Sequence, residues 1–186
     1  MKKTSLLYLS LTAAALAATV GAVNTRAAAG DLYVADAVAH TIYKFTPAGD
    51  KSTFASGLHQ PVALAFDREG NLFVADSGSG VPPGLSTIFK FTPDATESTF
   101  ATIGPTQLLG MAFDGAGNLF ISTGLDILKF APDGTQSTFA SGLAGVGPLA
   151  CDQLGNLYAA VNLIGLSSVL KFAPDGSSST FTSFPA

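Results

Sequence analysis

The sequence predicts an all-β fold made of four similar four-stranded antiparallel units, and three observations lead to this prediction. First, the same short sequence patterns recur in the same order at a spacing of roughly 40 residues, which marks an array of supersecondary units. Second, the patterns are rich in β-branched and aromatic residues, as strands are. Third, Gly- and Pro-containing turns separate them, and no segment after residue 29 keeps a helical period.

Two of the patterns predict the central strands of each unit. The first alternates apolar side chains and reads DLYVAD from Asp31, NLFVAD from Asn71, NLFIST from Asn118 and NLYAAV from Asn156. The second reads IYKFTPAG from Ile42, IFKFTPDA from Ile88, ILKFAPDG from Ile127 and VLKFAPDG from Val169. Its Pro presets φ for a type I turn, so each of these strands is expected to reverse sharply into the next.

The other two patterns predict the remaining strands. A short, partly polar pattern reads STFA from Ser52, Ser98 and Ser137 and STFT from Ser179, which suits an outer edge strand. An apolar pattern with small residues ends at Asp67, Asp114 and Asp152, and Gly-ended hairpins join it to the first pattern. Four-stranded units in tandem around an axis form a β-propeller, in which this crowded pattern lies innermost.

The N-terminal segment is interpreted as a secretory signal peptide spanning residues 1–29. A basic start at Met1–Lys3 precedes the apolar run Leu6–Ala18, and Ala27–Ala29 offers a small-residue cleavage site. Cleavage after Ala22 or Ala27 is an alternative. A membrane span is the competing interpretation, but the run is shorter than the roughly 20 apolar residues that a spanning helix needs. We therefore expect export to a periplasmic or extracellular location.

Charge and cysteine content exclude several partners. Removal of residues 1–29 leaves six basic against thirteen acidic residues, a net charge of −7. This balance argues against nucleic acid, whose phosphates are bound by Lys and Arg, and against anionic membrane surfaces. The chain has a single cysteine, so no internal disulfide is possible, and no membrane span is expected once the signal is removed.

The predicted propeller repeats occupy residues 30–186. The four blades are expected at about 30–56, 60–102, 107–141 and 146–184, by the repeat spacing. The first blade lacks its inner strand in this prediction, because the repeat begins at its second strand. An incomplete ring is favoured; a closed ring of four blades or a fragment of a longer propeller is the alternative. Open blade faces then predict self-association.

Four patterns of this repeat resemble those of the NHL-repeat propellers. They are PVALAFD from Pro61, GNLFVAD from Gly70, IFKFTPDA from Ile88 and STFA from Ser98. More loosely, the chain is similar to the gluconolactonase-like six-bladed propeller superfamily. The resemblance implies a propeller fold from Gly30 to the C-terminus. It does not imply one function, because propellers host unrelated activities.

Lactonases of that superfamily hold a divalent metal over the central channel, with some ligands at the start of inner strands. At the matching positions this sequence has Val62, Leu109 and Gly147, whose side chains cannot bind a hard cation. The resemblance therefore gives no support for that enzyme activity. No catalytic residue, metal ligand or cofactor is predicted, although an unsupported divalent metal stays open as an alternative.

Binding residues are expected where the repeat is irregular, on the face formed by the connections between second and third strands and between successive blades. The longest of these connections is 77–87. The candidate binding residues on this face are Asp36, His40, His59, Asp76, Asp126 and Asn162. Asp36, Asp76 and the two histidines can be a small metal site, or turn-capping acids beside solvated histidines; the second interpretation is favoured because the ligand spacing of a metal motif is missing.

The sequence thus predicts an exported propeller that binds an unknown protein or small molecule through its irregular face. A degenerate, metal-dependent gluconolactonase-like hydrolase is the alternative function.

Overall fold

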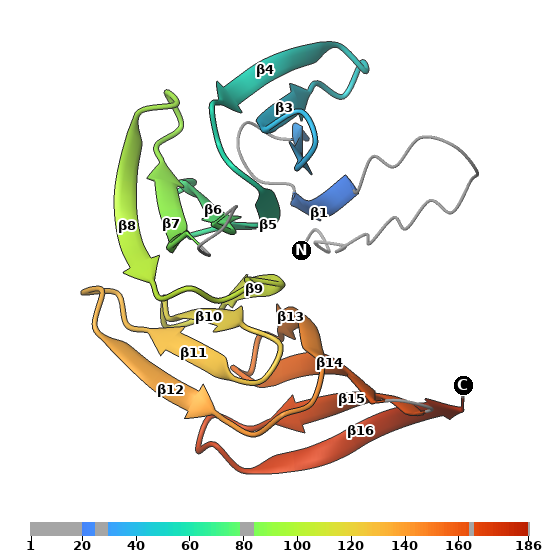
Figure 1. The fold of residues 1–186 in the computed structure, drawn as a ribbon. Coiled ribbons are helices and arrows are strands. Elements are labelled where there is room, and N and C mark those ends of the chain that lie inside the picture. The colour runs from blue at the N-terminus through green and yellow to red at the C-terminus, as the bar shows by residue number, and fades with distance from the viewer. Residues whose placement is uncertain (1–19, 25–29, 79–83, 164–165, 186) are drawn as a thin grey trace. The chain divides into compact units, whose positions relative to one another are not determined.

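The computed structural model describes residues 20–24, 30–78, 84–163 and 166–185. These residues form four antiparallel sheets, each of four strands, and within every sheet the strands lie side by side in chain order (Figure 1). No helix long and apolar enough to cross a membrane is found in the part of the chain that the structure describes. The predicted all-β fold of four-stranded antiparallel blades is confirmed.

Each sheet is one blade, numbered here in chain order. Blade one holds β1 (Val20–Asn24), β2 (Leu32–Asp36), β3 (Thr41–Phe45) and β4 (Lys51–Ser56). Blade two holds β5 (Pro61–Phe66), β6 (Leu72–Asp76), β7 (Ser86–Phe91) and β8 (Glu97–Ile103). Blade three holds β9 (Gly110–Phe113), β10 (Leu119–Ser122), β11 (Ile127–Phe130) and β12 (Gln136–Ala140). Blade four holds β13 (Val146–Cys151), β14 (Leu157–Leu163), β15 (Leu166–Phe172) and β16 (Ser178–Pro185).

One detail of the predicted fold is wrong: blade one has an inner strand. β1 pairs antiparallel with β2, joining Val20 to Asp36, Val23 to Val34 and Asn24 to Tyr33. The physical reason is that the free edge of β2 offers unpaired backbone groups, and the Val-rich segment just upstream can satisfy them. Most of the predicted signal peptide, residues 1–19 and 25–29, lies outside the described residues, but β1 falls within its predicted bounds.

The chain divides into two compact units, Met1–Thr106 with blades one and two and Gln107–Ala186 with blades three and four. We call them the N-terminal and C-terminal units. The core of the N-terminal unit lies between its two blades: Tyr33, Ala35 and Ile42 of blade one are buried in one cluster with blade two residues. The blade two members of that cluster are Leu64, Leu72, Val74 and Phe91.

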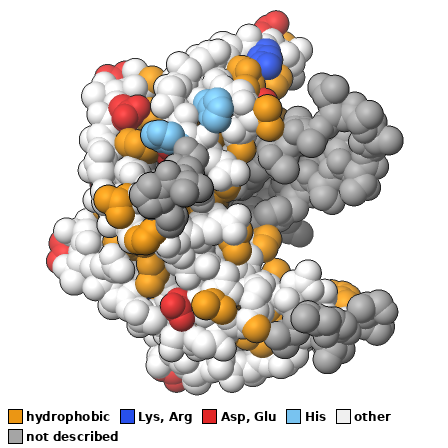
Figure 2. Space-filling view, viewed as in Figure 1, with side chains coloured by type: hydrophobic (Ala, Val, Ile, Leu, Met, Phe, Trp, Pro, Cys, Tyr) orange, Lys and Arg blue, Asp and Glu red, His pale blue; other side chains and the backbone are white. Residues whose placement is uncertain are grey.

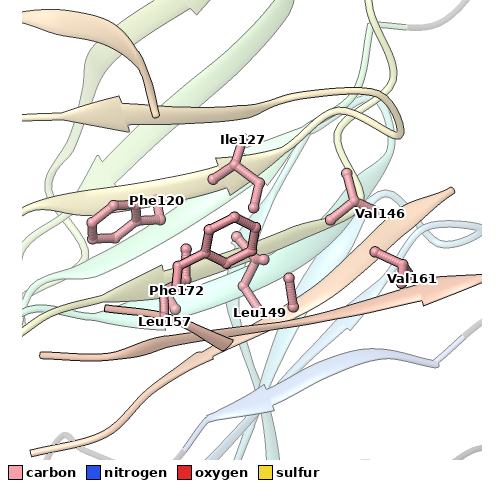
Figure 3. Packing of buried hydrophobic residues seen from close by; sticks show 9 residues of the cluster. Phe120, Ile127, Val146, Leu149, Leu157, Val161 and Phe172 are labelled. Atoms are coloured by element: carbon pink, nitrogen blue, oxygen red, sulfur yellow. The ribbon is translucent and has the colours of Figure 1, made fainter. Parts of the chain in front are cut away.

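The core of the C-terminal unit repeats this arrangement. Phe120 and Ile127 of blade three pack in one buried cluster with Leu157 and Phe172 of blade four (Figure 3). In both units the second and third strands therefore bury one set of alternate side chains against the neighbouring blade, as expected for strands whose side chains alternate between two faces.

A β-bulge recurs in the outer strand of every blade. The register between the third and fourth strands shifts once in each sheet, and the residue left over is the Phe of the STF pattern. These residues are Phe54, Phe100, Phe139 and Phe181. Each ring stacks edge-on against the aromatic side chain of its own second strand, at centroid distances of 4.9–5.2 Å. A bulge re-aims a side chain, and here it turns the Phe onto the blade face.

The repeated lysines and aspartates make the same contacts in successive blades. Each lysine ammonium lies 5.5–5.9 Å from the centroid of a second-strand aromatic ring, within cation–π range. Those lysines are Lys44, Lys90, Lys129 and Lys171.

Each Asp at the end of an inner strand accepts a hydrogen bond from the side-chain amide of the Asn four residues later in the chain, at 2.7 Å. Those pairs are Asp67–Asn71, Asp114–Asn118 and Asp152–Asn156.

Blade one departs from this pattern. An aspartate, Asp31, stands where the other blades have Asn, and its carboxylate accepts from Lys44 at 2.7 Å. This hydrogen bond is the main cause of a raised Lys44 pKa. In blade one the carboxylate therefore lies at the start of the second strand, whereas in the other blades it lies at the end of the inner strand. In both places it makes a hydrogen bond at the hairpin edge of the blade.

Candidate functional site

The irregular loop connections of the N-terminal unit are organised around the carboxylate of Asp76. This side chain ends β6 and is only 3 % exposed. Its oxygens accept the backbone amide of His59 at 2.9 and 3.1 Å and the amide of Gln60 at 2.5 Å. Because a buried carboxylate needs such donors, Asp76 fixes the connection that leads from blade one into blade two.

The two histidines lie on two connections that contact each other: His40 between β2 and β3, and His59 between β4 and β5. The Nδ1 atom of His40 is in hydrogen-bonding contact with the carbonyl of His59, and the backbone carbonyl of His40 accepts the amide of Leu58 at 3.3 Å. The ring of His59 is 70 % exposed, with Nδ1 3.8 Å from an oxygen of Asp76. Figure 2 shows both histidine side chains at the surface, beside one another. The structure therefore brings His40, His59 and Asp76 together.

His40 also adopts a left-handed backbone conformation, with φ of 56°. Asp36 stabilises the turn that leads to it, because its carboxylate accepts the amides of Val38 at 3.0 Å and Ala39 at 2.8 Å. Asp36 is thus a turn-capping acid, as the favoured interpretation of the sequence has it. The strain at His40 is confined to a turn whose end points are both hydrogen-bonded.

The arrangement does not form a cage of ligands. No group of three or more His, Cys, Asp or Glu side chains that can hold a metal ion occurs among the residues that the structure describes. The lone pairs of Asp76 already serve backbone amides, so a cation at this place would have to compete with the loop for them.

The two remaining candidates belong to the C-terminal unit, and both make hydrogen bonds between loop segments there. Asp126 accepts the amide of Gly142 at 3.3 Å and receives support from Thr123, whose hydroxyl accepts the Asp126 amide at 3.2 Å. Asn162 is exposed. Its backbone amide donates to the carbonyl of Gly145 at 3.1 Å, and its side-chain oxygen accepts from the hydroxyl of Ser167 at 3.4 Å. Both residues therefore hold the connection between β12 and β13, Asp126 through Gly142 and Asn162 through Gly145.

The positions that match lactonase ligands are apolar in the structure as well. Val62 is half-buried in β5, and Leu109, partly exposed, precedes β9 with its amide donating to the carbonyl of Ser122 at 3.0 Å. Gly147 lies in β13, and its carbonyl accepts from the hydroxyl of Ser122 at 2.5 Å. None of the three presents a side-chain oxygen.

Ser122 is a residue that the sequence analysis missed. It is completely buried at the end of β10, where blades one, two and four carry Ala35, Ala75 and Ala160. Its hydroxyl ties blade three to blade four through the carbonyl of Gly147. The departure from Ala in an otherwise regular repeat is the signal that marks it. Its role is to hold the junction, because a buried hydroxyl must find a partner.

Exposed aliphatic side chains are the second feature that the sequence analysis missed. In the connection between the second and third strands, Val38 of blade one, Leu85 of blade two and Leu125 of blade three are each 60–64 % exposed. An exposed aliphatic side chain thus occurs in the corresponding connection of three successive blades. Residues 79–83 of the longest connection lie outside the described residues.

Comparisons with known proteins agree on the fold. No family model matches the chain, and no curated protein matches it. Among solved structures, a streptogramin B lyase superposes with a TM-score of 0.71 at 13 % identity, over 91 % of this chain and 55 % of the lyase. A gluconolactonase from Xanthomonas campestris gives a TM-score of 0.70 at 18 % identity, over 88 % of this chain and 61 % of that one. A chain of a nidogen/laminin complex gives 0.69 at 15 % identity, over 84 % and 59 %.

These likenesses show that the chain has the fold of a β-propeller. At such low identity they carry the fold alone, since one propeller fold serves a lyase, a lactonase and a protein–protein complex. The chain spans between about half and three fifths of the length of these solved propellers.

Proposed function

We propose that this chain is an exported propeller of the NHL-repeat type that binds a partner through its loop face. The observation that carries the proposal is the contrast between acidic and aliphatic side chains there. Asp36 and Asp76 are occupied in shaping the loops, whereas Val38, Leu85 and Leu125 point into solvent. Side chains that are exposed, apolar and repeated are suited to contact a partner.

The chemistry of this face favours a peptide or protein segment with apolar side chains as the ligand. In the N-terminal unit Val38 and Leu85 are accompanied by the exposed side chains of His40 and His59, whose ring nitrogens are hydrogen-bonding groups. Apolar contact with a few polar groups is the usual composition of a recognition surface.

The alternative function is a metal-dependent hydrolase of the gluconolactonase type. A solved gluconolactonase shares the fold, which is the observation in its favour. Val62, Leu109 and Gly147 stand against it, because a hard cation needs oxygen ligands that these side chains lack. The binding function is therefore the better supported of the two.

A peptide-selection experiment tests the proposal. The purified protein is panned against a phage-displayed library of random peptides, and the affinity of the best enriched peptide is measured by titration calorimetry. We expect the double variant Val38→Ser/Leu85→Ser to weaken binding at least tenfold, as the loss of two buried aliphatic contacts implies. Leu154→Ser is the matched control, since Leu154 is an exposed leucine of a hairpin on the opposite edge of its blade.

Two results would contradict the binding proposal: no peptide enriched, or a selected peptide whose affinity is insensitive to the double variant. The hydrolase is tested separately, by glucono-lactone turnover and elemental analysis of the protein with calcium or zinc added. Turnover that requires a stoichiometric metal and that is lost in His40→Ala would establish the alternative function.

A further inference from the structure

The two terminal blades each have one face whose residues are less buried than their counterparts in the interior of the repeat. We call the face that packs on the preceding blade the leading face, and the face that packs on the following blade the trailing face. In blade two the leading face carries Leu72, Val74 and Phe91, and in blade four it carries Leu157, Ala159 and Phe172. All six residues are below 5 % exposed.

The same positions in blade one are Leu32, Val34 and Phe45, and all three are only half-buried. These side chains are apolar, like those that pack between blades, but they are less buried than their counterparts in blades two and four. Blade one therefore presents a leading face that no blade of its own unit covers.

Blade four shows the complementary case on its trailing face. In blade one the trailing face carries Tyr33, Ala35 and Ile42, all at or below 1 % exposed. The equivalent residues of blade four are Tyr158, Ala160 and Val169, and each is half-buried.

The bulge phenylalanine makes the comparison sharper. Phe54 reaches across from blade one to the ring of Phe91 in blade two, with centroids 5.8 Å apart at 63°. Phe139 reaches from blade three to Phe172 in blade four at 5.7 Å and 61°. Phe181 occupies the same bulge in blade four, stacks on Tyr158 of its own blade at 5.2 Å, and is 62 % exposed. It is placed like the other two but its outer side faces solvent.

We propose that the trailing face of blade four binds the leading face of blade one of a second copy of this chain. The junction is the one already present within each unit: Phe181 of one copy meets Phe45 of the other, as Phe139 meets Phe172. A second copy is the occupant because this chain carries both halves of the contact, so two copies satisfy each other's free faces. This inference does not depend on the proposed function.

The pairing is head to tail. When it occurs twice, blade four of each copy covers blade one of the other, so a symmetric dimer has two equivalent junctions. Such a dimer contains eight blades, at the upper end of the roughly four to eight that propellers use.

The test measures mass by light scattering over a wide range of concentrations, on the full chain expressed from its own start codon and purified in the processed form that results. We expect twice the chain mass for the unmodified protein. Phe181→Asp blocks the trailing face and Phe45→Asp blocks the leading face, so each variant alone should have the mass of one chain. Phe184→Asp is the control: Phe184 is exposed on the same strand, where blade one has Gly57, and this variant should remain a dimer.

Mixing the two variants distinguishes head-to-tail pairing from any other self-association. The free leading face of Phe181→Asp can bind the free trailing face of Phe45→Asp, so the mixture should regain a dimer with one junction. Circular dichroism and thermal unfolding check that each variant folds, and Val34→Asp replaces Phe45→Asp if the latter does not.

The inference is overturned by a monomeric unmodified protein at every concentration, by variants that stay dimeric, or by folded variants that do not pair when mixed.

Discussion

The ring of Phe139 on β12 lies 5.7 Å from the ring of Phe172 on β15, at an interplanar angle of 61°, and so joins blade three to blade four. The same relationship joins blade one to blade two through Phe54 and Phe91. The Phe on the outer strand is in each case the extra residue of a β-bulge. A bulge in the edge strand is therefore a device that locks one blade onto the next.

Truncation of this side chain should weaken the C-terminal unit. We expect Phe139→Ala to lower the free energy of unfolding by about 3 kcal/mol, the lower end of the range for Phe truncation, because the ring is only partly buried. Phe184→Ala should cost less than about 0.5 kcal/mol, as surface substitutions do. Urea unfolding of both variants, at equal protein concentration, makes the comparison. Equal losses for the two would show that the bulge contact does not stabilise the junction.

Gly110 should not tolerate even one added methyl group. A Cβ atom at this position would lie 2.5 Å from the carbonyl oxygen of Gly147 and 3.0 Å from the Cα atom of Pro148. Because backbone atoms cannot move aside cheaply, we expect Gly110→Ala to cost about 2 kcal/mol. Gly147→Ala is the control from the facing strand, since a Cβ atom there meets nothing within 4 Å. A thermal shift of similar size in both variants would contradict this reading of the contact between β9 and β13.

Cys151 should be inert in the folded protein. Burial raises the pKa of its thiol from 9.0 to about 12, and the carboxylates of Asp114 and Asp152 act in the same direction. The thiolate is the reactive form, so a disulfide reagent at pH 8 should label the folded protein far more slowly than the protein in urea. Fast labelling without denaturant would show that the thiol is accessible and ionised.

The same shift predicts a dependence of stability on alkaline pH. The unfolded thiol loses its proton near 9.0 while the folded thiol keeps it up to about 12, so rising pH stabilises the unfolded state in this window. The contribution of Cys151 to the free energy of unfolding is fully present below pH 9 and is lost progressively as the pH rises from 9 toward about 12. Cys151→Ala removes this component, and the difference between the two pH profiles of unfolding isolates it from other titrating groups. Parallel profiles would contradict the shift.

Signal processing should decide how many strands blade one has. β1 lies upstream of the predicted cleavage site after Ala29, so cleavage there removes it and leaves β2 with a free edge. We expect intact-mass analysis of the exported protein to find a chain that begins at Gly30. In that chain the amides of Val34 and Asp36 should exchange hydrogen faster than in a chain that keeps Val20–Asn24. A mature protein that begins before Val20 would instead show that β1 is a permanent part of the blade.

Much of the fold could be predicted because each blade is specified by its own short patterns. Alternating residues such as those from Asn71, a Pro-based turn after Phe91 and a Gly-ended hairpin at Gly70 act locally, and four copies give the same answer. The inner strand of blade one could not be predicted in this way. VGAVN does not match the repeat, and it becomes a strand only because the edge of β2 lies within reach.

The candidate site was only partly predictable, for a related reason. Departures from the repeat pointed to Asp76, His40 and His59, and the structure does bring these three together. The use of the Asp76 carboxylate depends on the path of the chain at His59 and Gln60, which no local pattern specifies. The exposure of Val38, Leu85 and Leu125 likewise depends on what surrounds each loop, not on the residue type.

The sequence by itself determined that this protein is a tandem array of four-stranded antiparallel blades, since strand periodicity and turn chemistry are properties of neighbouring residues. Only the tertiary structure decided which copies of a repeated residue are buried and which remain exposed. Phe139 and Phe181 stand in the same pattern and the same bulge, yet one is covered by Phe172 and the other is open to solvent. Burial depends on the blade that lies alongside, and that neighbour is set by packing between segments far apart in the chain.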